Sequence, residues 1–130
     1  MLFRSQVRFL AEGFLTLRII DPERGIMSFR LLVKMRFSYR NQDGSERSTM
    51  RAEKRFAEDF VPQVGTAIRV EGETCEVSGR ISDVWWRSQS ESDKIIIYTK
   101  EQVYSDGNVD QSREEHVRLL ESNGWTCLSR

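Results

Sequence analysis

A strict alternation of apolar and polar residues between Phe29 and Tyr39 constrains this chain most. Every odd position of the run is apolar, and four of the five even positions are polar or charged. Side chains of a β-strand point alternately to opposite faces, so this period of two predicts a strand with one face buried. The chain is therefore expected to fold around a sheet that has one apolar face.

Asp43 and Gly44 follow this run, and they are the favoured pair for a two-residue type I′ hairpin turn. That turn fixes which residues of the two strands face one another. Lys54 falls opposite Val33 and breaks the pattern, so its ammonium is expected to reach water. The other facing pairs support the register: Phe37–Met50, Met35–Ala52, Leu31–Phe56 and, as an opposite-charge pair, Lys34–Glu53.

Shorter strands are predicted within 68–70, 75–77, 81–86 and 95–99, and a polar loop within 88–93. Gly79 predicts a bulge or a bend. Ile81 and Trp85 are expected on one face, and Val84 and Trp86 on the other. A hairpin that is apolar on both faces is covered on both faces. The core covers one face, and the C-terminal helix, the N-terminal segment or a partner chain covers the other.

One helix is predicted near the C-terminus. Ser112 and Glu115 have the spacing of a capping box, and Asp110 is the alternative N-cap. Asn123 and Gly124 form a stop signal. Trp125 follows the stop, and we expect it to fold back onto the core.

These elements predict a mainly β (α+β) fold, a bent antiparallel sheet or small barrel of about five or six strands with a C-terminal helix. The segment 62–77 carries a proline, two glycines and two short strands around a tight turn. This segment resembles small SH3-like barrels, which are frequent among bacterial and bacteriophage proteins of undefined function. The resemblance implies a fold and supplies no catalytic residue.

The chain is divided into an N-terminal extension (1–26), a β-barrel-like domain (27–110) and a C-terminal helix and clasp (111–130). The extension has two interpretations. Alternation of Leu15, Leu17 and Ile19 with polar residues favours an extra strand. Alternatively, 1–26 is a translated leader, and the native start is Met27.

The charge is uneven although the net charge is zero. Residues 28–56 carry eight basic and three acidic side chains, whereas 57–130 carries an excess of acids. Arginines directly opposite one another repel, so a sequence that keeps them has a use for them or leaves them solvated. The hairpin carries no outward aromatic residue, which counts against nucleic-acid binding. The candidate interaction or phosphate-binding residues are the arginines of two facing pairs: Arg36 with Arg51, and Arg40 with Arg47.

Cysteine and histidine chemistry is sparse. Cys75, Cys127 and His116 have none of the spacings of a zinc site, so neither a metal nor another cofactor is expected. His116 is interpreted as a surface residue. Neighbouring carboxylates point apart on strands and helices, so no catalytic residue is proposed. No secretory signal and no membrane span are found, which favours a cytoplasmic location.

The leading functional hypothesis is a non-enzymatic interaction or assembly module of a bacterial or phage-like system. It uses the arginine-rich hairpin and the strand that carries Trp85 and Trp86, with a protein partner or a second copy of the chain. The alternative is a nucleic-acid-binding barrel that contacts phosphates through the hairpin arginines. A small enzyme with an acidic site is the third hypothesis.

Overall fold

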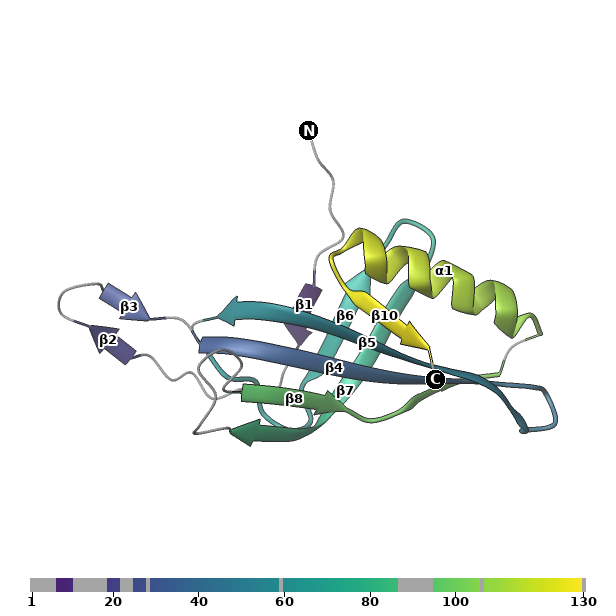
Figure 1. Cartoon of the computed structure of the whole chain (residues 1–130), viewed down its shortest axis with the longest axis horizontal. Helices are drawn as coiled ribbons and strands as arrows, with labels where there is room; N and C mark the ends of the chain where they lie inside the picture. Colours follow the sequence, from purple (N-terminus) through teal and green to yellow (C-terminus); the bar gives the residue numbers. More distant parts are fainter. Residues whose placement is uncertain are drawn as a thin grey trace.

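The computed structural model describes residues 7–10, 19–21, 25–27, 29–58, 60–86, 95–105 and 107–129. Within these ranges the chain is mainly β, with one helix near the C-terminus (Figure 1). The elements are β1 (Val7–Leu10), β2 (Ile19–Asp21), β3 (Gly25–Met27), β4 (Phe29–Arg40), β5 (Glu46–Glu58), β6 (Ala67–Glu71), β7 (Glu76–Trp86), β8 (Ile95–Thr99), β9 (Gln102–Tyr104), α1 (Val109–Ser122) and β10 (Thr126–Ser129).

One sheet organises the molecule. Its strands lie in the order β1-β6-β7-β8-β4-β5-β10, and β9 pairs with β4 beyond the end of β8. β8 and β9 run parallel to β4, whereas the other neighbours in this sheet are antiparallel. The sheet therefore has eight strands rather than five or six, and it is mixed rather than purely antiparallel. β2 and β3 form a separate two-stranded ladder.

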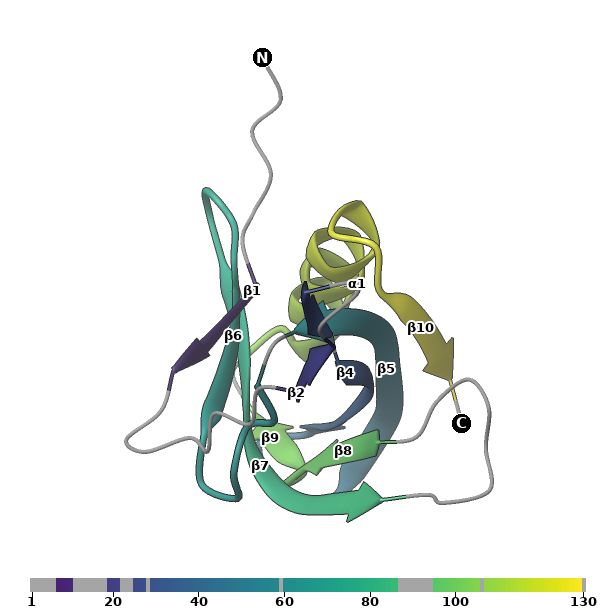
Figure 2. The ribbon, with the colours of Figure 1, turned by 90° about the vertical axis from the view of Figure 1, so that its left-hand side faces the viewer.

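The sheet curls into a half-barrel, and α1 lies across its open side (Figure 2). Side chains from both ends of the sheet and from α1 meet inside the curl, among them Leu31, Ile68, Ile97 and Leu120, which are fully buried. Trp125 folds back after the helix and packs edge-on against Phe56, with ring centroids 5.8 Å apart. The clasp predicted for Trp125 is confirmed, and the chain continues past it as β10, which pairs with β5.

The register of the β4–β5 hairpin is confirmed over most of its length. Met35 faces Ala52, Lys34 faces Glu53 and Arg36 faces Arg51. The ammonium of Lys54 does not end in water, because it donates a hydrogen bond to the carbonyl of Asn123. A cation at the C-terminus of a helix is stabilised by the exposed carbonyls there.

The turn of this hairpin differs from the prediction. The Gly44 N–H donates to the carbonyl of Asn41, and the Asn41 N–H donates to the carbonyl of Ser45. Gly44 has a positive φ of 88°, whereas Asp43 has not, so a type I′ turn is excluded. The turn has three residues instead of two, and the register shifts between Tyr39 and Arg40.

The register irregularity in β7 lies at Ser82 and not at Gly79, so a bulge at Gly79 is wrong, whereas a bend there stays a prediction. Gly79 faces Ile68 in regular register. A Cβ on Gly79 would come within 2.8 Å of Met35 Cε, so the glycine serves close packing. The register shift at Ser82 turns Asp83 and Trp85 outward, opposite Tyr98 and Ile96. Val84 and Trp86 consequently share the inner side with Ile81, which corrects the predicted arrangement.

The helix begins earlier than predicted. Asn108 is the N-cap, and its side-chain carbonyl accepts a hydrogen bond from the Gln111 N–H at 3.2 Å. Val109 is buried in the first turn, and this tertiary contact outweighs the capping box at Ser112. The stop at Asn123 and Gly124 is confirmed, with Gly124 at a φ of 87°.

The N-terminal extension is described only in part. β1 pairs antiparallel with β6 through Val7–Leu10. The predicted strand at Leu15 and Leu17 and the predicted polar loop at 88–93 lie outside the described residues. Both interpretations of 1–26, and the division at residues 26 and 110, stay predictions.

Candidate functional site

The two arginine pairs of the hairpin have different surroundings, and the predicted cluster of four is wrong. Arg40 faces Glu46 rather than Arg47, because the register shifts at this point. Its guanidinium lies 3.9 Å from a carboxylate oxygen of Glu101. Arg47 donates two hydrogen bonds to the carboxylate of Asp110, of 2.8 and 2.7 Å. This pairing lowers the pKa of Asp110 and raises the pKa of Arg47.

Arg36 and Arg51, in contrast, face each other across the hairpin. Their Cα atoms are register partners on β4 and β5, and both side chains point to the outer face of the sheet. Within the described part of the chain, no acidic side chain forms an ion pair with either guanidinium. The Nε of Arg51 is buried and has no hydrogen-bond partner. Two like charges directly opposite one another destabilise a sheet, so this pair lowers the stability of the apo protein.

Strands β7 and β8 bring aromatic side chains to the same outer face. Tyr98 of β8 is the register partner of Lys34, and Trp85 of β7 is the register partner of Ile96. The Lys34 ammonium lies 5.8 Å from the centroid of the Tyr98 ring. Trp85 is 60 % exposed. The sequence places no aromatic residue on the outer face of the hairpin, and the missing rings come from neighbouring strands.

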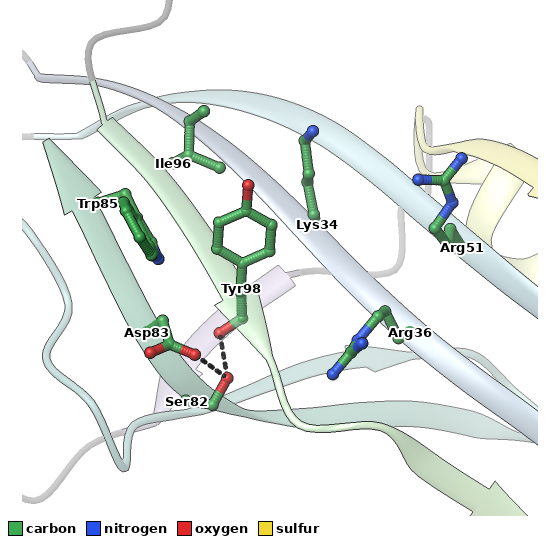
Figure 3. Close-up of a pocket in the computed structure, with 8 residues that line it drawn as sticks. All are labelled: Lys34, Arg36, Arg51, Ser82, Asp83, Trp85, Ile96 and Tyr98. Carbon is green, nitrogen blue, oxygen red and sulfur yellow. Dashed lines mark hydrogen bonds between the residues drawn. The ribbon is translucent and has the colours of Figure 1, made fainter. Parts of the chain in front are cut away.

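These side chains line a hollow of about 610 Å³ on the outer face (Figure 3). Trp85 lies at one end of it, and Arg36 and Arg51 lie at the other. Asp83 is exposed at the aromatic end and accepts a hydrogen bond from the Ser82 hydroxyl at 3.0 Å. The lining residues are Lys34, Arg36, Arg51, Ser82, Asp83, Trp85, Ile96 and Tyr98.

The floor at the aromatic end of the hollow is apolar. Ile96 and Leu32 are register partners, and both are buried although they belong to the outer face. The cover predicted for this face does not come from the C-terminal helix, because α1 packs on the inner side. The hollow thus combines an apolar, aromatic end with a cationic end.

Trp86 lies elsewhere, although it is 58 % exposed. It is the register partner of Ile95 on the inner side, and its ring packs edge-on against Phe29 with centroids 6.3 Å apart. Both candidate tryptophans are thus exposed, but they belong to opposite faces of the sheet. Of the two, Trp85 lines the same hollow as Arg36 and Arg51.

His116 is buried, so its interpretation as a surface residue is wrong. Its Nδ1 lies 2.8 Å from the hydroxyl of Tyr39, and its ring lies 4.6 Å from that of Tyr104, centroid to centroid. Tyr39 of β4 and Tyr104 of β9 lie side by side because they are register partners in the parallel pairing of these strands. The histidine is a polar member of the core beneath α1, on the opposite side of the sheet from the hollow.

The two cysteines are free. Burial raises the pKa of Cys75, and it raises the pKa of Cys127 to about 11. A thiol with a raised pKa is a poor nucleophile at neutral pH. No group of three His, Cys, Asp or Glu that could hold a metal ion occurs among the residues that the structure describes. In the same ranges, no helix is long and apolar enough to cross a membrane.

Comparisons with known proteins give no match. No protein-family model, no curated protein and no solved structure is similar to this chain. The functional argument therefore rests on the residues of the hollow.

The sequence patterns single out Arg36, Arg51 and Trp85 but not the other five residues that line the hollow, among them Lys34 and Tyr98. Lys34 was assigned to a pair with Glu53, and Tyr98 was interpreted only as part of an apolar strand. Their neighbourhood depends on β8 lying parallel to β4, across a separation of more than fifty residues. The local alternation of residues carries no signal for such a pairing.

Proposed function

We propose that this chain is a non-enzymatic nucleic-acid-binding module and that its ligand lies in the outer-face hollow. The main support is the pair of Arg36 and Arg51, which has no carboxylate partner among the described residues. This pair lines the same hollow as the exposed Trp85 and the half-buried Tyr98. Guanidinium groups bind phosphates through charge-assisted, often bidentate hydrogen bonds. Aromatic side chains next to a cationic groove are the second ingredient of proteins that bind nucleic acids.

The basic and aromatic side chains of the outer-face hollow support nucleic-acid binding. The hairpin itself has no outward aromatic residue. Tyr98 of β8 and Trp85 of β7 supply aromatic side chains on the same outer face. Arg40 and Arg47 are left out of the proposed site, because carboxylates neutralise them.

Fluorescence anisotropy of labelled single-stranded and duplex oligonucleotides tests this function. We expect binding at low salt that weakens steeply as salt is added, since phosphate contacts release counterions. Arg36→Ser and Arg51→Ser should each flatten the slope of log affinity against log salt by about 0.7 to 0.9.

The matched control is Arg118→Ser, which removes an exposed arginine of α1, on the other side of the core. This variant should bind like the wild type. Absence of binding to any oligonucleotide at low salt overturns the proposal. Equal losses in Arg118→Ser and Arg36→Ser also overturn it, because the effect would then reflect net charge alone.

A protein-interaction or assembly module is the second candidate function. The observation that favours it is the exposure of Trp85 and Trp86, since large exposed aromatic side chains are enriched at protein interfaces. Self-association that is measured by sedimentation and is abolished by Trp85→Ala would favour this candidate. In this second candidate function, the module belongs to a bacterial or phage-like system.

We also propose a relative for the fold and a cellular compartment for the protein. The β6–β7 hairpin, in which the Gly72 N–H donates to the Cys75 carbonyl, supports an SH3-like barrel as the relative of this fold. The free thiols of Cys75 and Cys127 support a reducing compartment such as the cytoplasm.

A further inference from the structure

We infer that the hollow binds single-stranded nucleic acid, with the phosphates at Arg36 and Arg51 and a base stacked on Trp85. This inference rests on the proposed function and specifies its ligand. It follows from three features of the outer face, namely the separation of charge along the hollow, the accessibility of the Trp85 ring and the size of the hollow.

The first feature is the direction of charge along the hollow. Arg36 and Arg51 lie at one end of the hollow, and Trp85 lies at the other. The register partners Lys34 and Tyr98 lie between the two ends. Asp83 adds a carboxylate at the aromatic end. A phosphate is attracted by the cationic end and repelled by Asp83. A bound nucleotide is therefore oriented with its base toward the aromatic end.

The second feature is the Trp85 ring itself. With 60 % of the residue exposed, a large part of the indole is open to a planar ligand. Ile96, the register partner of Trp85, also lines the hollow and adds an apolar surface beside the ring. A base that stacks on an aromatic side chain strengthens binding by about tenfold, with little dependence on which base it is.

The third feature separates single strands from a duplex. Bases within a duplex are stacked on one another, so their faces do not reach a protein ring. α1 packs on the inner side of the sheet, and the outer-face site is a hollow of about 610 Å³ lined by strand side chains. This size suits one or a few unstacked nucleotides rather than the surface of a duplex.

The test compares three labelled ligands of equal length at low salt: an oligothymidylate, the same strand with abasic sites in place of the bases, and a duplex. The abasic strand keeps the phosphates and removes the stacking. We expect the oligothymidylate to bind about tenfold more tightly than the abasic strand. It should also bind more tightly than the duplex, and it should quench the fluorescence of Trp85.

A pair of neighbouring variants provides the control. Trp85→Ala should weaken binding of the oligothymidylate about tenfold and leave the abasic strand unaffected. Trp86→Ala removes a tryptophan of nearly equal exposure from the opposite face and should change neither. Trp85→Phe, which keeps an aromatic ring, should restore most of the affinity. Far-UV circular dichroism confirms that each variant is folded.

The outcomes separate this inference from the function on which it rests. Equal affinity for the oligothymidylate and the abasic strand, or equal effects of Trp85→Ala and Trp86→Ala, would overturn base stacking and leave phosphate binding intact. Tighter binding of the duplex would overturn single-strand preference in the same way. No binding of any of the three ligands overturns both.

Discussion

The two faces of the β4–β5 hairpin alternate along the same strands and have different physical roles. On the inner face, Leu31, Val33 and Met35 are fully buried and join the core with α1. On the outer face, the arginines at positions 36 and 51 oppose each other without a carboxylate partner among the described residues. The inner face stabilises the fold, whereas the outer face carries an arrangement that lowers stability.

The outer face is itself divided. Near the turn, Arg47 donates a hydrogen bond to Asp110, and the guanidinium of Arg40 lies 3.9 Å from a carboxylate oxygen of Glu101. Further along, where β8 adjoins β4, Arg36 shares the hollow with Arg51, Lys34 and Tyr98, and Asp83 lines its aromatic end. The same residue type is thus neutralised at one end of the hairpin and left unpaired in its middle. We assign binding to the hollow that Arg36, Arg51 and the exposed Trp85 line together.

The largest expected effect concerns the inner face. Leu31→Ala removes a fully buried side chain and should lower the free energy of unfolding by about 2–5 kcal/mol, because it leaves a cavity in a close-packed core. Arg30→Ala, at the adjacent outward position, should change it by less than about 0.5 kcal/mol. Chemical denaturation measures both. Similar losses in the two variants would contradict the division into two faces.

The next effect compares a tyrosine from each face. Tyr39→Phe removes the hydroxyl that is hydrogen-bonded to His116, so stability should fall by about 1 kcal/mol. Tyr98→Phe on the outer face should leave stability nearly unchanged, and it keeps the ring in the hollow. Thermal unfolding of the two variants tests this, and a larger loss for Tyr98→Phe would show that the buried hydrogen bond contributes nothing.

A smaller effect sharpens the division within the outer face. The hydrogen bonds from Arg47 lower the pKa of Asp110 below its ordinary value of 3.8. A carboxyl with a lowered folded-state pKa stabilises the protein above its ordinary pKa, and this contribution disappears as the pH falls through the lowered value. Asp110→Asn should therefore be slightly less stable than the wild type at pH 7.

Melting temperatures measured from pH 7 to about pH 2 check this prediction. The curves of the wild type and of Asp110→Asn should converge at the acidic end. A difference that persists unchanged into acid would mean that the side chain acts through something other than its ion pair with Arg47.

The smallest expected effect on stability is at the binding site. Arg36→Ser relieves the repulsion from Arg51 and should raise the free energy of unfolding by a few tenths of a kcal/mol, about the scale of a cross-strand pair. The same variant should bind oligonucleotides more weakly. A clear loss of stability in urea titrations would show that Arg36 has a structural role instead, and the argument from the unpaired arginines would fail.

Local sequence patterns predicted the inner face well. The alternation of Phe29–Tyr39 and the sign of each facing pair were sufficient for the register down to Arg36 and Arg51. The helix stop at Asn123 and the clasp of Trp125 were likewise predictable from short motifs. The turn type and the bulge were not, because a three-residue turn and a two-residue turn share the same Asp-Gly signal.

The amino-acid sequence by itself determined which side chains of the regular strand β4 belong to the inner face, since the period of two is a property of the extended backbone. Only the tertiary structure decided which strands became neighbours. The parallel pairing of β8 and β9 with β4 joins segments that are far apart in the chain, and it places Tyr98 beside Lys34 and Tyr104 beside Tyr39. The bulge at a single residue, Ser82, places Trp85 on the same outer face of the sheet as Arg36 and Arg51. Such pairings depend on the packing of the whole sheet, which no local pattern encodes.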